Sequence, residues 1–80
     1  MKIPRDLTAS QLSRGLRELG YEITRQKGSH IRLTKVLIGG DHHVTIPNHS
    51  PIKIGTLNSI ITDVSSRLKI SKEDLIAYLK

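Results

Sequence analysis

The sequence predicts an α+β fold, in which a helix, a three-stranded antiparallel sheet and a second helix follow one another and a short helix is appended. Apolar residues recur at helical spacing before residue 20 and again after residue 56. Between residues 21 and 46 they alternate with polar residues, as in a strand with one buried face. The Gly39-Gly40 pair marks a tight turn within this region. This order predicts helices packed against one face of an antiparallel sheet, with the other face polar.

The first helix is expected to begin after Thr8, because Thr8 and Gln11 have the spacing of a capping box. Gly20 is placed to end the helix in the left-handed conformation. Arg14 and Arg17 point away from the apolar stripe of this helix. They form either a solvated helix face or a contact surface for phosphates.

Three strands are predicted, over Tyr21–Gln26, about His30–Leu37 and about His42–Ile46, with residues 27–29 as the first turn. If Gly39 and Gly40 are the two residues of the second turn, Leu33 lies opposite Ile46 and His30 lies opposite His49. The alternation assigns one set of residues to the buried face, namely Tyr21, Ile23, Ile31, Leu33, Val44 and Ile46. It assigns another set to the polar face, namely His30, Arg32, Thr34, His43 and Thr45.

A second helix is expected from about Gly55–Thr56, with Thr56 or a neighbour as its cap. Ser71 is expected to cap a short last helix, with Asp74 at the capping-box position. The sequence has no repeat, linker or low-complexity segment. We therefore expect residues 1–80 to form a single domain.

Charge is the strongest compositional signal. The 80 residues carry a net charge of +6, and the isoelectric point is about 10.1. A basic balance of this size favours a polyanionic partner, most often nucleic acid, although an acidic protein partner or a merely soluble basic domain would also fit. Tyr21 and Tyr78 are the only aromatic residues. An RNA partner would therefore be held by charge, hydrogen bonds and shape rather than by stacking on aromatic side chains.

The chain has no cysteine, no segment resembling a signal peptide, and no apolar run long enough to span a bilayer. These features suit a cytoplasmic protein without a membrane partner.

Four histidines fall within twenty residues, so a metal site is the first chemistry to test. His42 and His43 are adjacent in a strand and point to opposite faces, and neither a cysteine nor a well-placed carboxylate completes a ligand set. We expect no metal and no cofactor, and we expect both histidines to be exposed near the turn. A Ser/His/Asp triad is disfavoured because no aspartate is placed to reach His30.

RNA strand cleavage fits the pattern best, since it needs a base, an acid and groups that stabilise the phosphorane. His30 is the candidate base or acid, at the start of a strand and after a turn. The Gly28 and Ser29 amides, together with Lys27, are expected to hold the phosphate. Arg25 and Arg32 are also expected to bind RNA. His49 is a candidate for the second proton-transfer group. His49 is as well explained as a connector residue that bonds to the backbone.

The stretch Lys27-Gly28-Ser29-His30 resembles the Gly-Ser-His signature of HicA toxins, and residues 45–50 and 54–61 resemble the second block of that family. The resemblance implies a fold like that of double-stranded-RNA-binding domains and a ribosome-independent mRNA interferase from a toxin–antitoxin pair. It also implies a HicB-like antitoxin that covers the active site. The catalytic histidine of the family maps onto His30, and its Pro-x-His-Ser segment maps onto Pro47, His49 and Ser50.

Two other functions remain open at this point. One is a non-catalytic RNA-binding module on the same fold. The other is a DNA-binding regulator that uses the last two helices, which is disfavoured because Lys72, Glu73 and Asp74 would have to enter the major groove. The sequence also leaves open a homodimer or a heterotetramer with the antitoxin.

Overall fold

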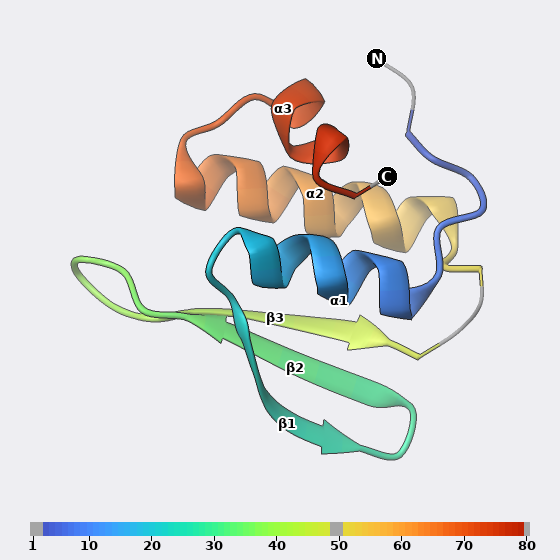
Figure 1. Ribbon diagram of the computed structural model, residues 1–80, viewed down its shortest axis with the longest axis horizontal. Coiled ribbons are helices and arrows are strands. Elements are labelled where there is room, and N and C mark those ends of the chain that lie inside the picture. The colour runs from blue at the N-terminus through green and yellow to red at the C-terminus, as the bar shows by residue number, and fades with distance from the viewer. Residues whose placement is uncertain (1–2, 49–50, 80) are drawn as a thin grey trace.

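A computed structural model of the protein describes residues 3–48 and 51–79. The elements follow in the order α1 (Ala9–Glu18), β1 (Glu22–Lys27), β2 (His30–Lys35), β3 (His42–Pro47), α2 (Ile54–Leu68) and α3 (Lys72–Ala77). The strands form one antiparallel sheet in the order β1-β2-β3 (Figure 1). The predicted α+β class and its element order are confirmed.

All three helices lie on the same side of the sheet (Figure 1). α1 and α2 pack on the sheet, and α3 lies on the side of these helices that faces away from it. In the described part of the chain, no helix covers the opposite face of the sheet. The buried core between sheet and helices is built mainly from aliphatic side chains, including Leu12, Leu16, Leu33, Val44, Ile46, Leu57, Ile61 and Val64.

The caps of α1 and α3 follow the sequence signals. The Thr8 hydroxyl accepts a hydrogen bond from the Gln11 amide at 3.1 Å, and the Gln11 side chain accepts one from the Thr8 amide at 2.9 Å. The Ser71 hydroxyl accepts a hydrogen bond from the Asp74 amide at 3.0 Å. The predicted cap of α2 is wrong, because α2 begins at Ile54 and its N-cap, Lys53, makes no side-chain capping bond.

The predicted pairing of β2 with β3 is wrong by two residues. Leu33 lies opposite Val44 rather than Ile46, and His30 lies opposite Pro47 rather than His49. The strands end at Lys35 and resume at His42, so six residues connect them where a two-residue turn was expected. An even shift leaves every side chain of β2 and β3 on its predicted face, because strand side chains alternate with a period of two.

The connection between β2 and β3 turns around Ile38 and Gly39. The Gly40 amide donates to the Leu37 carbonyl at 3.2 Å, and Gly39 has a φ of +93°. A positive φ at the third residue of a β-turn is a conformation that glycine adopts without strain. The glycine pair therefore marks the right connection but not the centre of the turn.

A β-bulge interrupts β1. Ile23 pairs with Leu33, but Arg25 pairs with Arg32, so Thr24 is the extra residue. A strict alternation from Tyr21 would put Arg25 and Lys27 on the helix side of the sheet. Because the bulge adds one residue, both instead lie on the helix-free face with their partners Arg32 and His30.

Ile23 departs from its predicted place in the core. It faces the helix side, as its partner Leu33 does, but its side chain is 42% exposed. β1 is an edge strand, and all six of its residues are exposed. The helices therefore bury the apolar helix-side residues of β2 and β3 and leave the β1 edge open.

Gly15 lies in the middle of α1 where the C-terminal end of the chain crosses the helix. A Cβ atom at this position would come within 2.6 Å of both the Tyr78 carbonyl oxygen and Leu79 Cδ2. A glycine inside a helix ordinarily costs about 1 kcal/mol relative to alanine. Here the missing side chain lets the end of α3 approach α1 directly.

We predict that Gly15→Ala destabilises the fold by about 1–3 kcal/mol, because the overpacking at the Tyr78 backbone outweighs the gain in helix propensity. Urea denaturation measures the change. Gly55→Ala in α2 is the matched control, since nothing lies within 4 Å of a Cβ atom there. We expect Gly55→Ala to be neutral or to stabilise by up to about 1 kcal/mol. Equal behaviour of the two variants would show that the close approach at Gly15 is unimportant.

Candidate active site

The helix-free face of the sheet carries a basic pocket around His30. The pocket has a volume of about 290 Å³ and is lined by Arg25, Lys27, His30, Arg32 and Thr45. Four of these five residues were predicted as site residues from the sequence, and Thr45 was predicted on this face. The pocket thus joins the proposed catalytic histidine to three of the residues predicted to bind RNA.

The pairing of the strands explains how these side chains meet. Lys27 lies opposite His30, and Arg32 lies between Arg25 on β1 and Thr45 on β3. Residues that are directly opposite in an antiparallel pair have side chains on the same face and in contact range. The bulge at Thr24 is therefore a condition for this pocket.

The turn that precedes His30 is open to solvent. Gly28 has a φ of +57°, and no heavy atom lies within 4 Å of the position that a Cβ atom would occupy. Ser29 is exposed, and its carbonyl accepts a hydrogen bond from the Asn48 amide at 2.5 Å. Gly28 and Ser29 do not line the pocket, although they adjoin the two residues, Lys27 and His30, that do.

His49, the other candidate proton-transfer group, lies outside the described residues, as does Ser50. The sequence predicts that His49 lies opposite His30. Pro47 occupies that position, so the register no longer supports His49.

No carboxylate of the described residues neutralises the charge of the pocket. In residues 3–48 and 51–79, the only carboxylate within 4 Å of a basic side chain is that of Asp63, which lies beside His42. Arg25, Lys27 and Arg32 therefore have no carboxylate within 4 Å among these residues. Three cations that converge without a counter-ion form a favourable site for a phosphate.

A row of polar side chains continues across the same face toward the other end of the strands. The Thr24 and Thr34 hydroxyl oxygens are 2.8 Å apart, and the Thr34 hydroxyl is 2.8 Å from His43 Nδ1. His43 is exposed, as predicted. It is not among the residues that line the His30 pocket.

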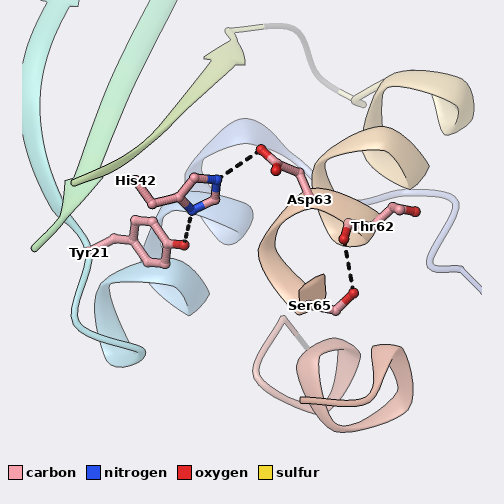
Figure 2. A network of polar contacts seen from close by, with 5 residues as sticks. All are labelled: Tyr21, His42, Thr62, Asp63 and Ser65. Atoms are coloured by element: carbon pink, nitrogen blue, oxygen red, sulfur yellow. Dashed lines mark hydrogen bonds and ion pairs between the residues drawn. The ribbon is translucent and has the colours of Figure 1, made fainter. Parts of the chain in front are cut away.

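The expectation that His42 is exposed is wrong. Only 4% of His42 is exposed, and its ring lies between Tyr21 and Asp63 (Figure 2). The Tyr21 hydroxyl is 2.5 Å from His42 Nδ1, and Asp63 Oδ2 is 2.9 Å from His42 Nε2. His42 is the first residue of β3 and faces the helices, so Asp63 of α2 reaches it rather than His30.

One arrangement of protons satisfies all three groups. The Tyr21 hydroxyl donates to Nδ1 of a neutral His42, and Nε2–H donates to the Asp63 carboxylate. Tyr21 is 1% exposed, so neither Tyr21 nor His42 is accessible to a substrate. This network joins the chain after α1, the start of β3 and α2, and its role is structural.

The pKa of Tyr21 is raised from 10.0 to about 12. The main cause is desolvation by burial, and the negative charge of Asp63 adds to it, while Arg67 acts in the opposite direction. A group whose pKa is raised on folding contributes stability below its unfolded pKa and loses it as the pH rises through the folded value. The contribution of Tyr21 is therefore complete below about pH 10 and is lost as the pH approaches 12.

We predict that Tyr21→Phe lowers the free energy of unfolding near neutral pH by about 1–3 kcal/mol, because His42 Nδ1 is left buried without a partner. Between about pH 10 and 12, the wild-type protein should lose more stability than this variant. Urea denaturation across the pH range measures both effects. Tyr78→Phe is the control, since Tyr78 is 45% exposed and should change stability by less than about 0.5 kcal/mol. An equally unstable Tyr78→Phe variant would contradict the assignment.

Comparison with protein families identifies the chain. The family model described as "HicA toxin of bacterial toxin-antitoxin" matches residues 9–65, which is more than two thirds of the chain. The chain belongs to the HicA toxin family. It is therefore a toxin of a toxin–antitoxin system, and its partner is an antitoxin. The matched segment spans α1, the sheet and most of α2, and it includes His30. No curated protein and no solved structure matches the chain.

Two further findings concern the described part of this HicA toxin. No helix in it is long and apolar enough to cross a membrane. Within residues 3–48 and 51–79, no group of three or more His, Cys, Asp or Glu side chains is placed to hold a metal ion.

Proposed function

We propose that this HicA toxin is a ribosome-independent mRNA interferase, an endoribonuclease in which His30 transfers protons. The observation that carries the proposal is the pocket in which His30 meets Arg25, Lys27 and Arg32 on the open face of the sheet. Histidine exchanges protons near neutral pH, and the three cations match the charge of an RNA phosphate. We take residues 1–80 as a single HicA-like domain acting in the cytoplasm.

In the proposed reaction, His30 accepts the proton of a ribose 2′-hydroxyl. The 2′-oxygen then forms a bond to the adjacent phosphorus, and the bond from phosphorus to the 5′-oxygen breaks. The leaving 5′-oxygen takes up a proton from an acid. The products of this step are a cyclic phosphate and a 5′-hydroxyl, so the reaction needs no cofactor.

The cations around His30 supply the electrostatic part of the proposed catalysis. Negative charge grows on the phosphoryl oxygens as the 2′-oxygen attacks, and donors that are already in place stabilise it. Arg25 and Arg32, which pair across the strands, are proposed to hold the phosphate. Lys27 lies opposite His30 and is proposed to bind the same group together with the Gly28 and Ser29 amides.

The acid that protonates the leaving 5′-oxygen is proposed to be His49. His49 keeps this role as a proposal from the resemblance of its Pro-x-His-Ser segment to the family. Its alternative role is that of a connector residue. A His49→Ala variant that retains full activity would remove it from the mechanism.

The proposed antitoxin is HicB-like and covers the His30 pocket. The uncompensated charge of that pocket supports the proposal, since a covering protein would meet three cations without local counter-ions. A homodimer of the toxin and a heterotetramer with the antitoxin are the two proposed assemblies.

A non-catalytic RNA-binding module is the second candidate function. It is favoured by the exposed position of His30, whose ring has no hydrogen-bond partner among the described residues. A general base is commonly oriented by a third group, and in the described part of the chain only His42 has such a carboxylate. A DNA-binding regulator is not carried further, since α3 has six residues and two of its first three, Glu73 and Asp74, are acidic.

We predict that His30→Ala lowers kcat for cleavage of a single-stranded RNA by at least about 100-fold, since general acid–base catalysis typically supplies about 10²–10⁴ in rate. RNA binding should persist in this variant, because the cations of the pocket remain. Single-turnover cleavage of a labelled RNA and fluorescence anisotropy measure the two properties.

His43→Ala is the matched control, because His43 is an exposed histidine on the same face of the sheet that does not line the pocket. It should cleave RNA within about twofold of the wild-type rate, as expected for a surface change away from the site. If the wild type and His30→Ala cut equally, His30 is not the catalytic residue. If purified wild type binds RNA and cuts none, the non-catalytic module is the correct function.

A further inference from the structure

A second pocket lies on the other side of the sheet, between α1 and the end of the β1–β2 pair. It has a volume of about 410 Å³, and its polar lining includes Arg14 and Arg17 of α1, Gln26 of β1 and Asn48 after β3. Among these residues, only Arg14 and Arg17 were considered as phosphate contacts from the sequence. A volume in this range is typical of pockets that bind small organic ligands.

The two arginines supply the charge of this pocket. They are three residues apart on α1, so their side chains lie on the same helix face, and both are exposed. Neither has a carboxylate within 4 Å in residues 3–48 and 51–79, where only the Asp63 carboxylate, beside His42, lies that close to a basic side chain. Two adjacent guanidinium groups without counter-ions are suited to a phosphate, which arginine binds with paired hydrogen bonds.

A third residue of α1 also lines the pocket. Ser13 is 7% exposed, and its hydroxyl is the only buried side-chain polar atom without a hydrogen-bond partner among the described residues. A buried hydroxyl without a partner costs free energy, so such groups are rare in folded proteins. Because Ser13 lines this pocket, a ligand bound there would provide the missing partner.

The remaining lining suits a nucleobase. Gln26 and Asn48 have side-chain amides, which present a donor and an acceptor together and pair with the edges of bases. Ile23 and Ile31 add aliphatic surface between these amides and α1. The 42% exposure of Ile23, which was expected in the core, is explained if the flat face of a base covers it.

The second pocket adjoins the proposed active site across the β1–β2 pair. Gln26 pairs with Ile31, and the next pair toward the turn, Lys27 and His30, faces the opposite side of the sheet. The Asn48 amide bonds to the carbonyl of Ser29, the residue before His30. The two pockets are thus on opposite faces of the same end of the sheet, and the exposed Gly28-Ser29 turn lies at that end.

We propose that the pocket between α1 and β1 binds one unstacked nucleotide of the RNA substrate, a neighbour of the nucleotide that His30 attacks. Arg14 and Arg17 bind its phosphate, and Gln26 and Asn48 bind the edge of its base. The RNA strand passes around the Gly28-Ser29 turn from one face of the sheet to the other. This inference rests on the proposed function, since it assigns a subsite of the same substrate.

The subsite accounts for base recognition in a chain with two tyrosines and no other aromatic residue. Proteins that recognise single-stranded RNA commonly stack its bases on aromatic side chains. Tyr21 is buried and Tyr78, although exposed, lines neither pocket, so neither is available for stacking there. Amide hydrogen bonds and an aliphatic surface replace that stacking here, and they distinguish bases by their edges rather than by their faces.

The test compares RNA binding by Arg14→Gln/Arg17→Gln with binding by Arg5→Gln/Arg67→Gln, both in a His30→Ala background that prevents cleavage. Each pair removes two exposed arginines, and Arg5 and Arg67 do not line either pocket. Fluorescence anisotropy with short single-stranded RNAs measures the affinity at several salt concentrations. We expect the first pair to weaken binding at least about tenfold more than the control pair. We also expect it to reduce the slope of log K against log salt by about 0.7, the value for one lost phosphate contact on a single strand.

A second measurement tests the base contacts. Gln26→Ala/Asn48→Ala should lose about tenfold of the discrimination between RNAs of different base composition, while Asn58→Ala, an exposed amide on α2, should retain it. Circular dichroism confirms that each variant is folded. Equal losses in the two arginine pairs, together with unchanged base preference, would overturn the subsite. If the subsite variants weaken RNA binding but the wild-type protein cuts no RNA, the proposed cleavage is wrong and the subsite is retained.

Discussion

The β-bulge at Thr24 is the local feature on which both pockets depend. It adds one residue to β1, so that Arg25 and Lys27 join His30 on the open face while Gln26 faces α1. A regular strand starting from Tyr21 would exchange these faces and would direct two cations toward the core. Bulges often lie next to functional sites because they redirect side chains without breaking the sheet. Here the bulge gives one edge strand a different set of polar groups on each face.

The fold could be predicted from the sequence because its signals are local. Thr8 and Gln11 mark the start of α1 by their own hydrogen bonds, and the alternation of apolar residues marks β2 and β3. The pairing of β2 with β3 was wrong by two residues, yet the faces were right because the error was even. For the same reason His30, Arg32 and Thr45 were correctly placed on one face, and the family resemblance pointed to the same histidine.

The rest depended on contacts between residues distant in the sequence. Nothing in the sequence around His42 shows that Tyr21 and Asp63, each 21 residues away, enclose it. Alternation also gives no sign of where an extra residue enters a strand, so the bulge was not predicted. The pocket that contains Gln26 and Asn48 was missed because it is formed by α1, β1 and the segment after β3. A polar residue flanked by strand residues has no distinctive spacing, so no sequence signal marks it.

The Tyr21–His42–Asp63 network lies at the end of the sheet where residues 36–41 connect β2 to β3. Both pockets lie at the opposite end, which the Gly28-Ser29 turn forms. The groups that hold the elements together and the groups proposed to contact RNA are therefore different residues at different ends of the same strands. The pocket residues Arg25, Lys27, Gln26 and His30 are exposed, so replacing them removes little buried surface. The RNA preference proposed for this toxin is therefore free to diverge through point mutations around His30 while the fold keeps its stability, which makes this small scaffold readily evolvable.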